Sequence, residues 1–256
     1  MNQNNLEKIT TNRLLVSGDS WMDHECNWYS EIFDYQSVTD LAVAGSGNRY
    51  IAESVMDRVI YHADVDFVLV NWSGLNRIDF ALPRGLPAGY RDPSSPRRVT
   101  ENSQYWTNNM APWRDRSVSL HIDERLTRLM YQEKAYRSVK SQSLLQVILL
   151  QDFLRARGIP YLCCFLYDYA NLDFDHNHLT HECQSEGFST LGSVAATELL
   201  LQELDPKHTL WPAGLDWALT QHNDLFKDST HLTTQGYRLW ARELLRQYHA
   251  RHDDHQ

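Results

Sequence analysis

The sequence of 256 residues predicts an α/β fold, one domain with a doubly wound parallel sheet between two layers of helices. Short apolar runs alternate with segments of helical periodicity, and parallel strands need such crossover helices to connect them. Several apolar runs stop abruptly at glycine or polar residues, as strands do at the ligand-binding edge of such a sheet. No linker or internal repeat divides the chain, so the predicted domain spans residues 1–256.

The first third of the chain contains the clearest strand and helix signals. Leu14, Leu15 and Val16 have the apolar character of a buried strand, and Gly18 allows a sharp turn directly after them. The elements expected next, in chain order, are a helix over residues 21–33, a strand over 37–44, a helix over 49–62 and a strand over 65–71.

A long segment without periodicity follows the third expected strand. Residues 79–118 are rich in proline, arginine and aromatic residues, and a loop of this length inside a compact domain is usually functional. We interpret this insertion as a lid or a substrate wall. The elements expected after it are a helix over 123–157, a buried strand over 161–167, a helix over 194–204 and a terminal helix to about residue 249, capped by Thr233 or Thr234.

Charge and composition argue against several classes of partner and location. The chain has 24 basic and 33 acidic residues, and its net charge of −9 argues against nucleic acid or an anionic membrane as the main partner. No apolar run approaches the roughly 18 residues of a membrane span, and residues 1–12 lack the apolar centre of a signal peptide. We therefore expect a cytoplasmic protein whose cysteines are reduced. They are Cys26, Cys163, Cys164 and Cys183.

Polar residues that can carry chemistry stand at the ends of the expected strands. Ser20 falls where the first strand ends and a helix should begin, a position that suits either a helix cap or a nucleophile. Gly45 follows the second strand and Asn76 the third. Asp228 and His231 precede the terminal helix. A doubly wound sheet would bring these positions together at one edge.

The order and spacing of these blocks resemble the GDSL/SGNH hydrolase family, whose members are esterases. Gly18-Asp19-Ser20 matches the first block of the family, and Asp228-Ser229-Thr230-His231-Leu232 with Gly236 matches the last. The resemblance implies a flavodoxin-like, three-layer fold with Ser20 as nucleophile, His231 as general base and acid, and Asp228 as the residue that orients His231. A serine hydroxyl needs such a base, because it is a weak nucleophile at neutral pH.

The resemblance also implies an oxyanion hole formed by the N–H groups of Ser20 and Gly45 and by the side chain of Asn76. The third block departs from the family pattern, because Arg77 stands where an aspartate is usual. Gly74-Leu75-Asn76 keeps the Gly-x-Asn spacing, so we favour Asn76. Other residues that could stand at or near this position are Ser73, Leu75, Asn48 and Asn71.

The inserted segment is the only guide to the substrate. Its aromatic and arginine residues favour a carbohydrate ester with a small acyl group, although the same rings could simply pack on the body of the protein. The candidate substrate-binding residues are Trp21, Trp72, Tyr105, Trp106 and Trp113. The alternatives are a lipase or thioesterase for longer acyl chains, an acyltransferase, and a non-catalytic module that binds glycan or protein.

No motif for a cofactor or a metal is present. Gly45-Ser46-Gly47 belongs to neither of the common phosphate-binding patterns, and the GxSxG elbow is absent because Met22 follows Ser20 by two positions. The histidine-rich segment 175–183 matches no standard zinc spacing. We therefore expect a cofactor-independent enzyme acting on a small-molecule or glycan ester, and its oligomeric state stays open.

Overall fold

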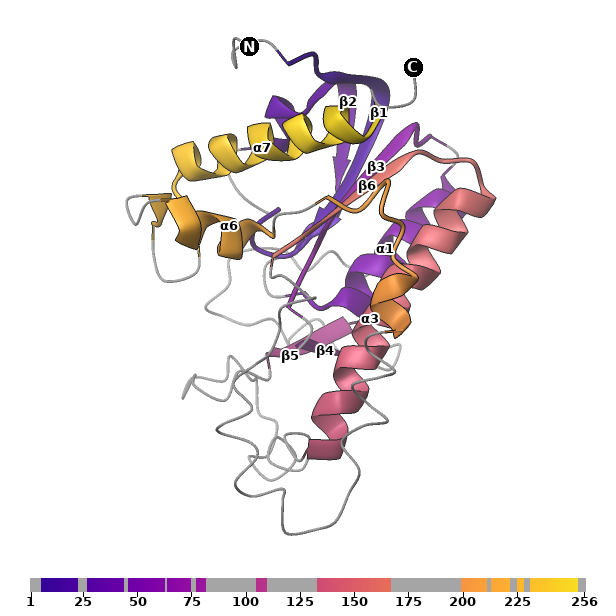
Figure 1. The fold of residues 1–256 in the computed structure, drawn as a ribbon. Coiled ribbons are helices and arrows are strands. Elements are labelled where there is room, and N and C mark those ends of the chain that lie inside the picture. The colour runs from indigo at the N-terminus through magenta and orange to yellow at the C-terminus, as the bar shows by residue number, and fades with distance from the viewer. Residues whose placement is uncertain are drawn as a thin grey trace, which may run out of the picture.

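A four-stranded parallel sheet forms the centre of the computed structural model (Figure 1). The structure describes residues 6–22, 27–43, 46–62, 64–74, 77–81, 105–109, 133–166, 199–210, 213–221, 225–227 and 231–252. The strands lie in the order β2 (Phe33–Asp40), β1 (Ile9–Gly18), β3 (Phe67–Trp72) and β6 (Tyr161–Phe165). Thr209 adds a parallel bridge to Cys163 on the far side of β6. In this order β2 lies on one side of β1 and the later strands β3 and β6 lie on the other, which confirms the predicted doubly wound α/β fold.

Helices cover both faces of the sheet (Figure 1). On one face lie α1 (Asn48–Tyr61) and α3 (Glu133–Ala156), and on the other lie η1 (Trp28–Glu31), α6 (Gly214–Gln221) and α7 (Thr234–His252). Buried side chains alternate along β3 between the two cores, with Leu69 on the α7 face and Val68 and Val70 on the α1 face. These two cores confirm the predicted three layers.

Two expectations for the segment after β1 are wrong. Residues 21–33 do not form one helix, since η1 is a single short turn preceded by Asn27 in a left-handed conformation with φ of 41°. The second strand begins at Phe33 and ends at Asp40, four residues earlier than the expected range of 37–44. This strand lies at the sheet edge and most of its side chains are at least partly exposed, so its apolar pattern is weak.

The segment predicted to be an irregular insertion contains a small second sheet. β4 (Arg77–Ala81) pairs in antiparallel register with β5 (Tyr105–Asn109). β4 also lies against α1. Most of the predicted 79–118 loop lies outside the described residues.

The later elements agree in part with the predictions. The described part of α3 begins at Glu133, and the start predicted at 123 lies outside the described residues. The expected helix over 194–204 is helical over residues 199–202 where it is described. α6 was not predicted, whereas α7 follows the prediction closely. Within the described part of the chain, no helix is long and apolar enough to cross a membrane.

A polar cluster links the start of β6 to residues 205–208. It lies at the amino ends of the parallel strands, whereas Ser20 lies at their carboxyl ends. Asp205 accepts hydrogen bonds from the Tyr161 hydroxyl at 3.0 Å, the Lys207 N–H at 3.0 Å and the His208 imidazole at 2.9 Å. Burial raises the pKa of the Asp205 carboxyl, but these hydrogen bonds together outweigh burial and hold that pKa below its ordinary value. The ionised carboxylate therefore stabilises the folded chain.

Candidate active site

Ser20 lies in a tight turn at the carboxyl end of β1. The N–H of Met22 donates to the carbonyl oxygen of Asp19 at 3.0 Å, which closes the turn. Glycine is needed just before it, because a Cβ atom on Gly18 would lie 2.9 Å from the carbonyl oxygen of Asn71 and 2.7 Å from Cβ of Met22. The turn therefore packs tightly against the end of β3, and the half-buried Ser20 projects from it.

The structure brings Ser20 and His231 together from positions 211 residues apart in the chain. Nε2 of His231 lies 3.0 Å from Oγ of Ser20, which is within hydrogen-bond distance. Both side chains are half-buried, so each keeps some exposed surface. A hydroxyl in contact with an imidazole nitrogen can lose its proton to that nitrogen while it attacks an electrophile. This pair is the chemically most significant contact in the described structure.

Backbone hydrogen bonds hold His231 in place at the start of α7. Its carbonyl oxygen accepts from the N–H of Lys227 at 2.8 Å, and the N–H of Thr233 donates to the carbonyl oxygen of Leu225 at 2.7 Å. The Thr233 hydroxyl accepts from the N–H of Gly236 at 3.1 Å, so Thr233 is the residue that caps α7. His231 thus takes part in a short antiparallel pairing that directly precedes a capped helix.

Several residues predicted for the site lie outside the described residues. They are Asp228, Gly45, Asn76 and Trp113. Tyr105 and Trp106 begin β5, and the structure describes their backbone pairing with β4 but not their side chains. The predicted roles of all these residues stay predictions.

The expectation that Trp21 and Trp72 contact a substrate does not hold. Trp21 is 1% exposed and packs edge-on against Tyr237 and Trp240 in the core beneath α7. Trp72 is fully buried in the other core, between the sheet and the α1 and α3 layer. Rings with no accessible face cannot stack on a ligand, so these two contribute to packing.

A buried group of polar side chains behind Ser20 was not predicted. Asp19 is fully buried and accepts hydrogen bonds through Oδ1 from the N–H of Trp21 at 3.0 Å and through Oδ2 from the Ser73 hydroxyl at 3.1 Å. The side-chain oxygen of Asn48 accepts from the N–H of Ser73 at 2.9 Å, and its amide group donates to the Ser73 carbonyl oxygen at 3.4 Å. Nothing in the sequence except the short polar residues themselves indicates these partners.

These contacts bear on the residues considered as alternatives to Asn76. Ser73, Asn48 and Asn71 are each at most 1% exposed. The Ser73 hydroxyl donates to Asp19, and Asn48 binds the backbone of Ser73. None of the three presents exposed polar surface to a substrate.

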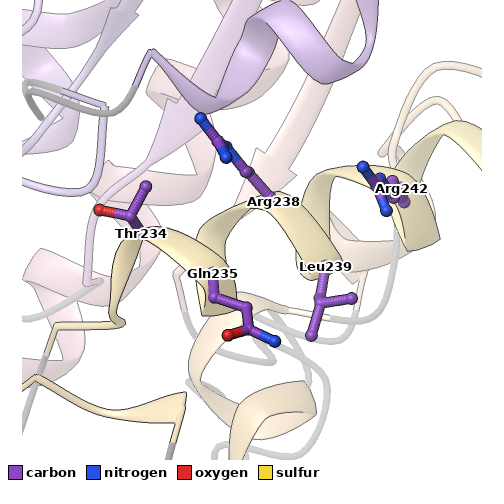
Figure 2. Close-up of a pocket in the computed structure, with 5 residues that line it drawn as sticks. All are labelled: Thr234, Gln235, Arg238, Leu239 and Arg242. Atoms are coloured by element: carbon purple, nitrogen blue, oxygen red, sulfur yellow. The ribbon is translucent and has the colours of Figure 1, made fainter.

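A hollow of about 420 Å³ lies along α7 (Figure 2). Its lining is Thr234, Gln235, Arg238, Leu239 and Arg242, which Figure 2 shows along one side of the helix. The two arginines pair with Glu31 at 3.7 and 3.1 Å. Neither Ser20 nor His231 lines this hollow, so we do not assign the chemistry to it. Among the described residues, no three His, Cys, Asp or Glu side chains gather as a metal site would require.

No protein-family model and no curated protein sequence matches the chain. A lipase from a goat-rumen metagenome is similar in structure, with a TM-score of 0.46 and 12% identity over 93% of this chain and 97% of that one. A member of the lipolytic G-D-S-L family from Veillonella parvula has a TM-score of 0.45 and 13% identity over 92% of this chain and 97% of that one. An alpha/beta hydrolase enzyme from a Lake Arreo metagenome has a TM-score of 0.42 and 10% identity over the same shares.

Proposed function

We propose that this protein is a serine esterase of the SGNH type that forms an acyl-enzyme intermediate on Ser20. One observation carries the proposal, the 3.0 Å separation of Ser20 Oγ and His231 Nε2 at the carboxyl edge of a parallel sheet. The two residues stand in the first and last sequence blocks that resemble the family, and neither block specifies this distance.

The proposed reaction has two stages. Ser20 Oγ attacks the carbonyl carbon of the ester while His231 accepts the hydroxyl proton. The tetrahedral intermediate collapses, the bond to the alcohol oxygen breaks, and His231 returns the proton to that oxygen. Water then loses a proton to His231 and attacks the acyl carbon, and Ser20 leaves with the proton as the acid is released.

Four further groups complete the proposal. Asp228 would accept a hydrogen bond from the Nδ1–H of His231 and so keep Nε2 free to act as the base. The N–H groups of Ser20 and Gly45 and the side chain of Asn76 would stabilise the oxyanion. Loss of one such donor typically reduces turnover about 100- to 1,000-fold, so the identity of the third donor affects rate more than reaction type.

We propose a carbohydrate carrying a small acyl group, most simply acetyl, as the substrate. The support is the composition of the insertion over residues 79–118, which is rich in aromatic and arginine residues. Hydrolysis of nitrophenyl acetate in preference to nitrophenyl octanoate, followed by release of acetate from acetylated sugars, is the expected result. Activity restricted to the octanoate ester would favour a lipase or thioesterase instead.

A fluorophosphonate probe tests the reaction class directly, because it phosphonylates an activated serine. The intact protein should be labelled on Ser20, Ser20→Ala should not be labelled, and His231→Ala should react at least about 1,000-fold more slowly. His62→Ala is a matched control, since this histidine is exposed at the end of α1. An intact protein that takes up no label would favour a binding module on the same fold.

An acyltransferase would use the same residues and give the same labelling. Product analysis in the presence of an acceptor alcohol separates the two activities. The proposed hydrolase releases free acid, whereas a transferase forms a new ester in preference.

A further inference from the structure

The turn that carries Ser20 is held from within the protein by Asp19. The Asp19 carboxylate has no exposed surface, and its two oxygens accept from different segments. Oδ1 accepts from the N–H of Trp21, on the far side of Ser20, and Oδ2 accepts from the hydroxyl of Ser73, after β3. The carboxylate therefore links the backbone on the far side of Ser20 to the segment that follows β3.

Asn48 provides a second link, between the segment after β3 and the start of α1. Its side-chain amide accepts from the N–H of Ser73 at 2.9 Å and donates to the carbonyl oxygen of the same residue at 3.4 Å, as a neighbouring strand would. Asn48 is 1% exposed, so these bonds are shielded from water. Asn48 lies three positions after Gly45, and Ser73 lies three positions before Asn76. The link thus joins the two segments that carry the proposed oxyanion donors.

We infer that Ser73 and Asn48 are positioning residues for the proposed esterase. Through its hydrogen bond to Asp19, Ser73 orients the Ser20 side chain toward His231. Asn48 keeps the segments beside Gly45 and Asn76 at a constant separation. This inference rests on the proposed function of Ser20. A buried carboxylate that loses a hydrogen-bond donor turns toward its remaining partners, and the turn that depends on it shifts with it.

Ser73→Ala removes the hydroxyl and keeps both backbone bonds to Asn48. A nucleophile displaced by a fraction of an ångström to 1 Å loses reactivity by up to about 100-fold. We expect kcat for nitrophenyl acetate and the rate of fluorophosphonate labelling to fall together, by about 10- to 100-fold, with KM unchanged. Asn48→Ala should lower kcat in the same range.

Ser17→Ala is the matched control. Ser17 is also a fully buried serine near the end of β1, but its hydroxyl lies 3.4 Å from the Ser54 hydroxyl on α1. This variant should change thermal stability about as much as Ser73→Ala and leave kcat at the wild-type value. Ser73→Cys, which keeps the size of the side chain and a weak donor, should react at a rate between those of Ser73→Ala and wild type.

The outcomes separate this inference from the function on which it rests. If the wild-type protein is labelled on Ser20 but Ser73→Ala and Ser17→Ala react equally fast, the positioning role is wrong and the esterase proposal stands. If Ser73→Ala does not fold, wild-type reactivity in Ser73→Cys and in Asn48→Ala contradicts the inference in the same way. A wild-type protein inert to probe and ester overturns both.

Discussion

Gly236, in the first turn of α7, tests whether close packing beside His231 keeps that residue in place. A Cβ atom at this position would lie 2.8 Å from the carbonyl oxygen of Leu225 and 3.0 Å from Cβ of Leu232. The Leu225 oxygen also accepts the 2.7 Å hydrogen bond from Thr233, so it cannot move away without straining that bond. Gly236→Ala therefore pushes on the backbone on both sides of the His231 segment.

Two opposing effects determine the size of the change. Alanine favours the helix over glycine by about 1 kcal/mol. Overpacking costs about 1–3 kcal/mol, and the upper part of this range applies because the close contacts are with a backbone oxygen and a Cβ atom that cannot rotate away. We expect a net loss of about 1–2 kcal/mol in the free energy of unfolding. For a chain of this size, Tm should fall by about 2–8 °C.

Thermal unfolding and kcat for nitrophenyl acetate should be measured on the same preparations. The shift of the His231 segment should lower kcat about tenfold. Val59→Ala is the control. Val59 lies in the last turn of α1 and is 6% exposed, and the substitution removes two buried methyl groups, which costs about 2 kcal/mol. A Gly236→Ala protein more stable than wild type, or one as active as Val59→Ala, would refute the reasoning.

Four other residues give three further predictions. Asp205→Asn should lower the free energy of unfolding by about 1–3 kcal/mol at pH 7. The pKa of Asp205 is lowered in the folded protein, so the difference in stability between variant and wild type should shrink below about pH 4. Urea unfolding at pH 7 and at pH 3 measures this difference. Burial raises the pKa of Cys163 to about 12, and Cys164 is also fully buried. Both thiols should therefore resist alkylation by iodoacetamide until guanidinium is added, as peptide mass spectrometry will detect. Trp21→Ala should lower stability by about 3–5 kcal/mol in urea unfolding, and a fully stable variant would contradict its place in the core.

The parts of the fold that the sequence predicts well are those buried on both sides. β3, β6 and the later half of β1 appear as short apolar runs, because parallel strands between two helix layers have no exposed face there. β2 has one neighbour and mostly exposed side chains, so its start at Phe33 was not predicted. The aromatic residues between Trp21 and Ile32 imitate a helical pattern, although they pack from a turn and one short 3₁₀ turn.

The residues of the candidate site also divide into those that the sequence predicts and those that it does not. Ser20 and His231 stand in sequence blocks whose order is recognisable, and the fold places them 3.0 Å apart. The bonds that join Asp19, Ser73 and Asn48 connect residues 25 and 54 positions apart. Short polar residues of this kind carry no periodicity and no spacing rule, so only the packed structure identifies their partners.

Trapping the acyl group is the most direct test of the central claim that Ser20 is the nucleophile. The protein should be mixed with nitrophenyl acetate, quenched in acid during turnover, digested, and mapped by mass spectrometry. We predict an acetyl group on the peptide that contains Ser20 and on its hydroxyl, with neither adduct nor turnover in Ser20→Ala. An adduct on another residue, or continued turnover by Ser20→Ala, would contradict the account.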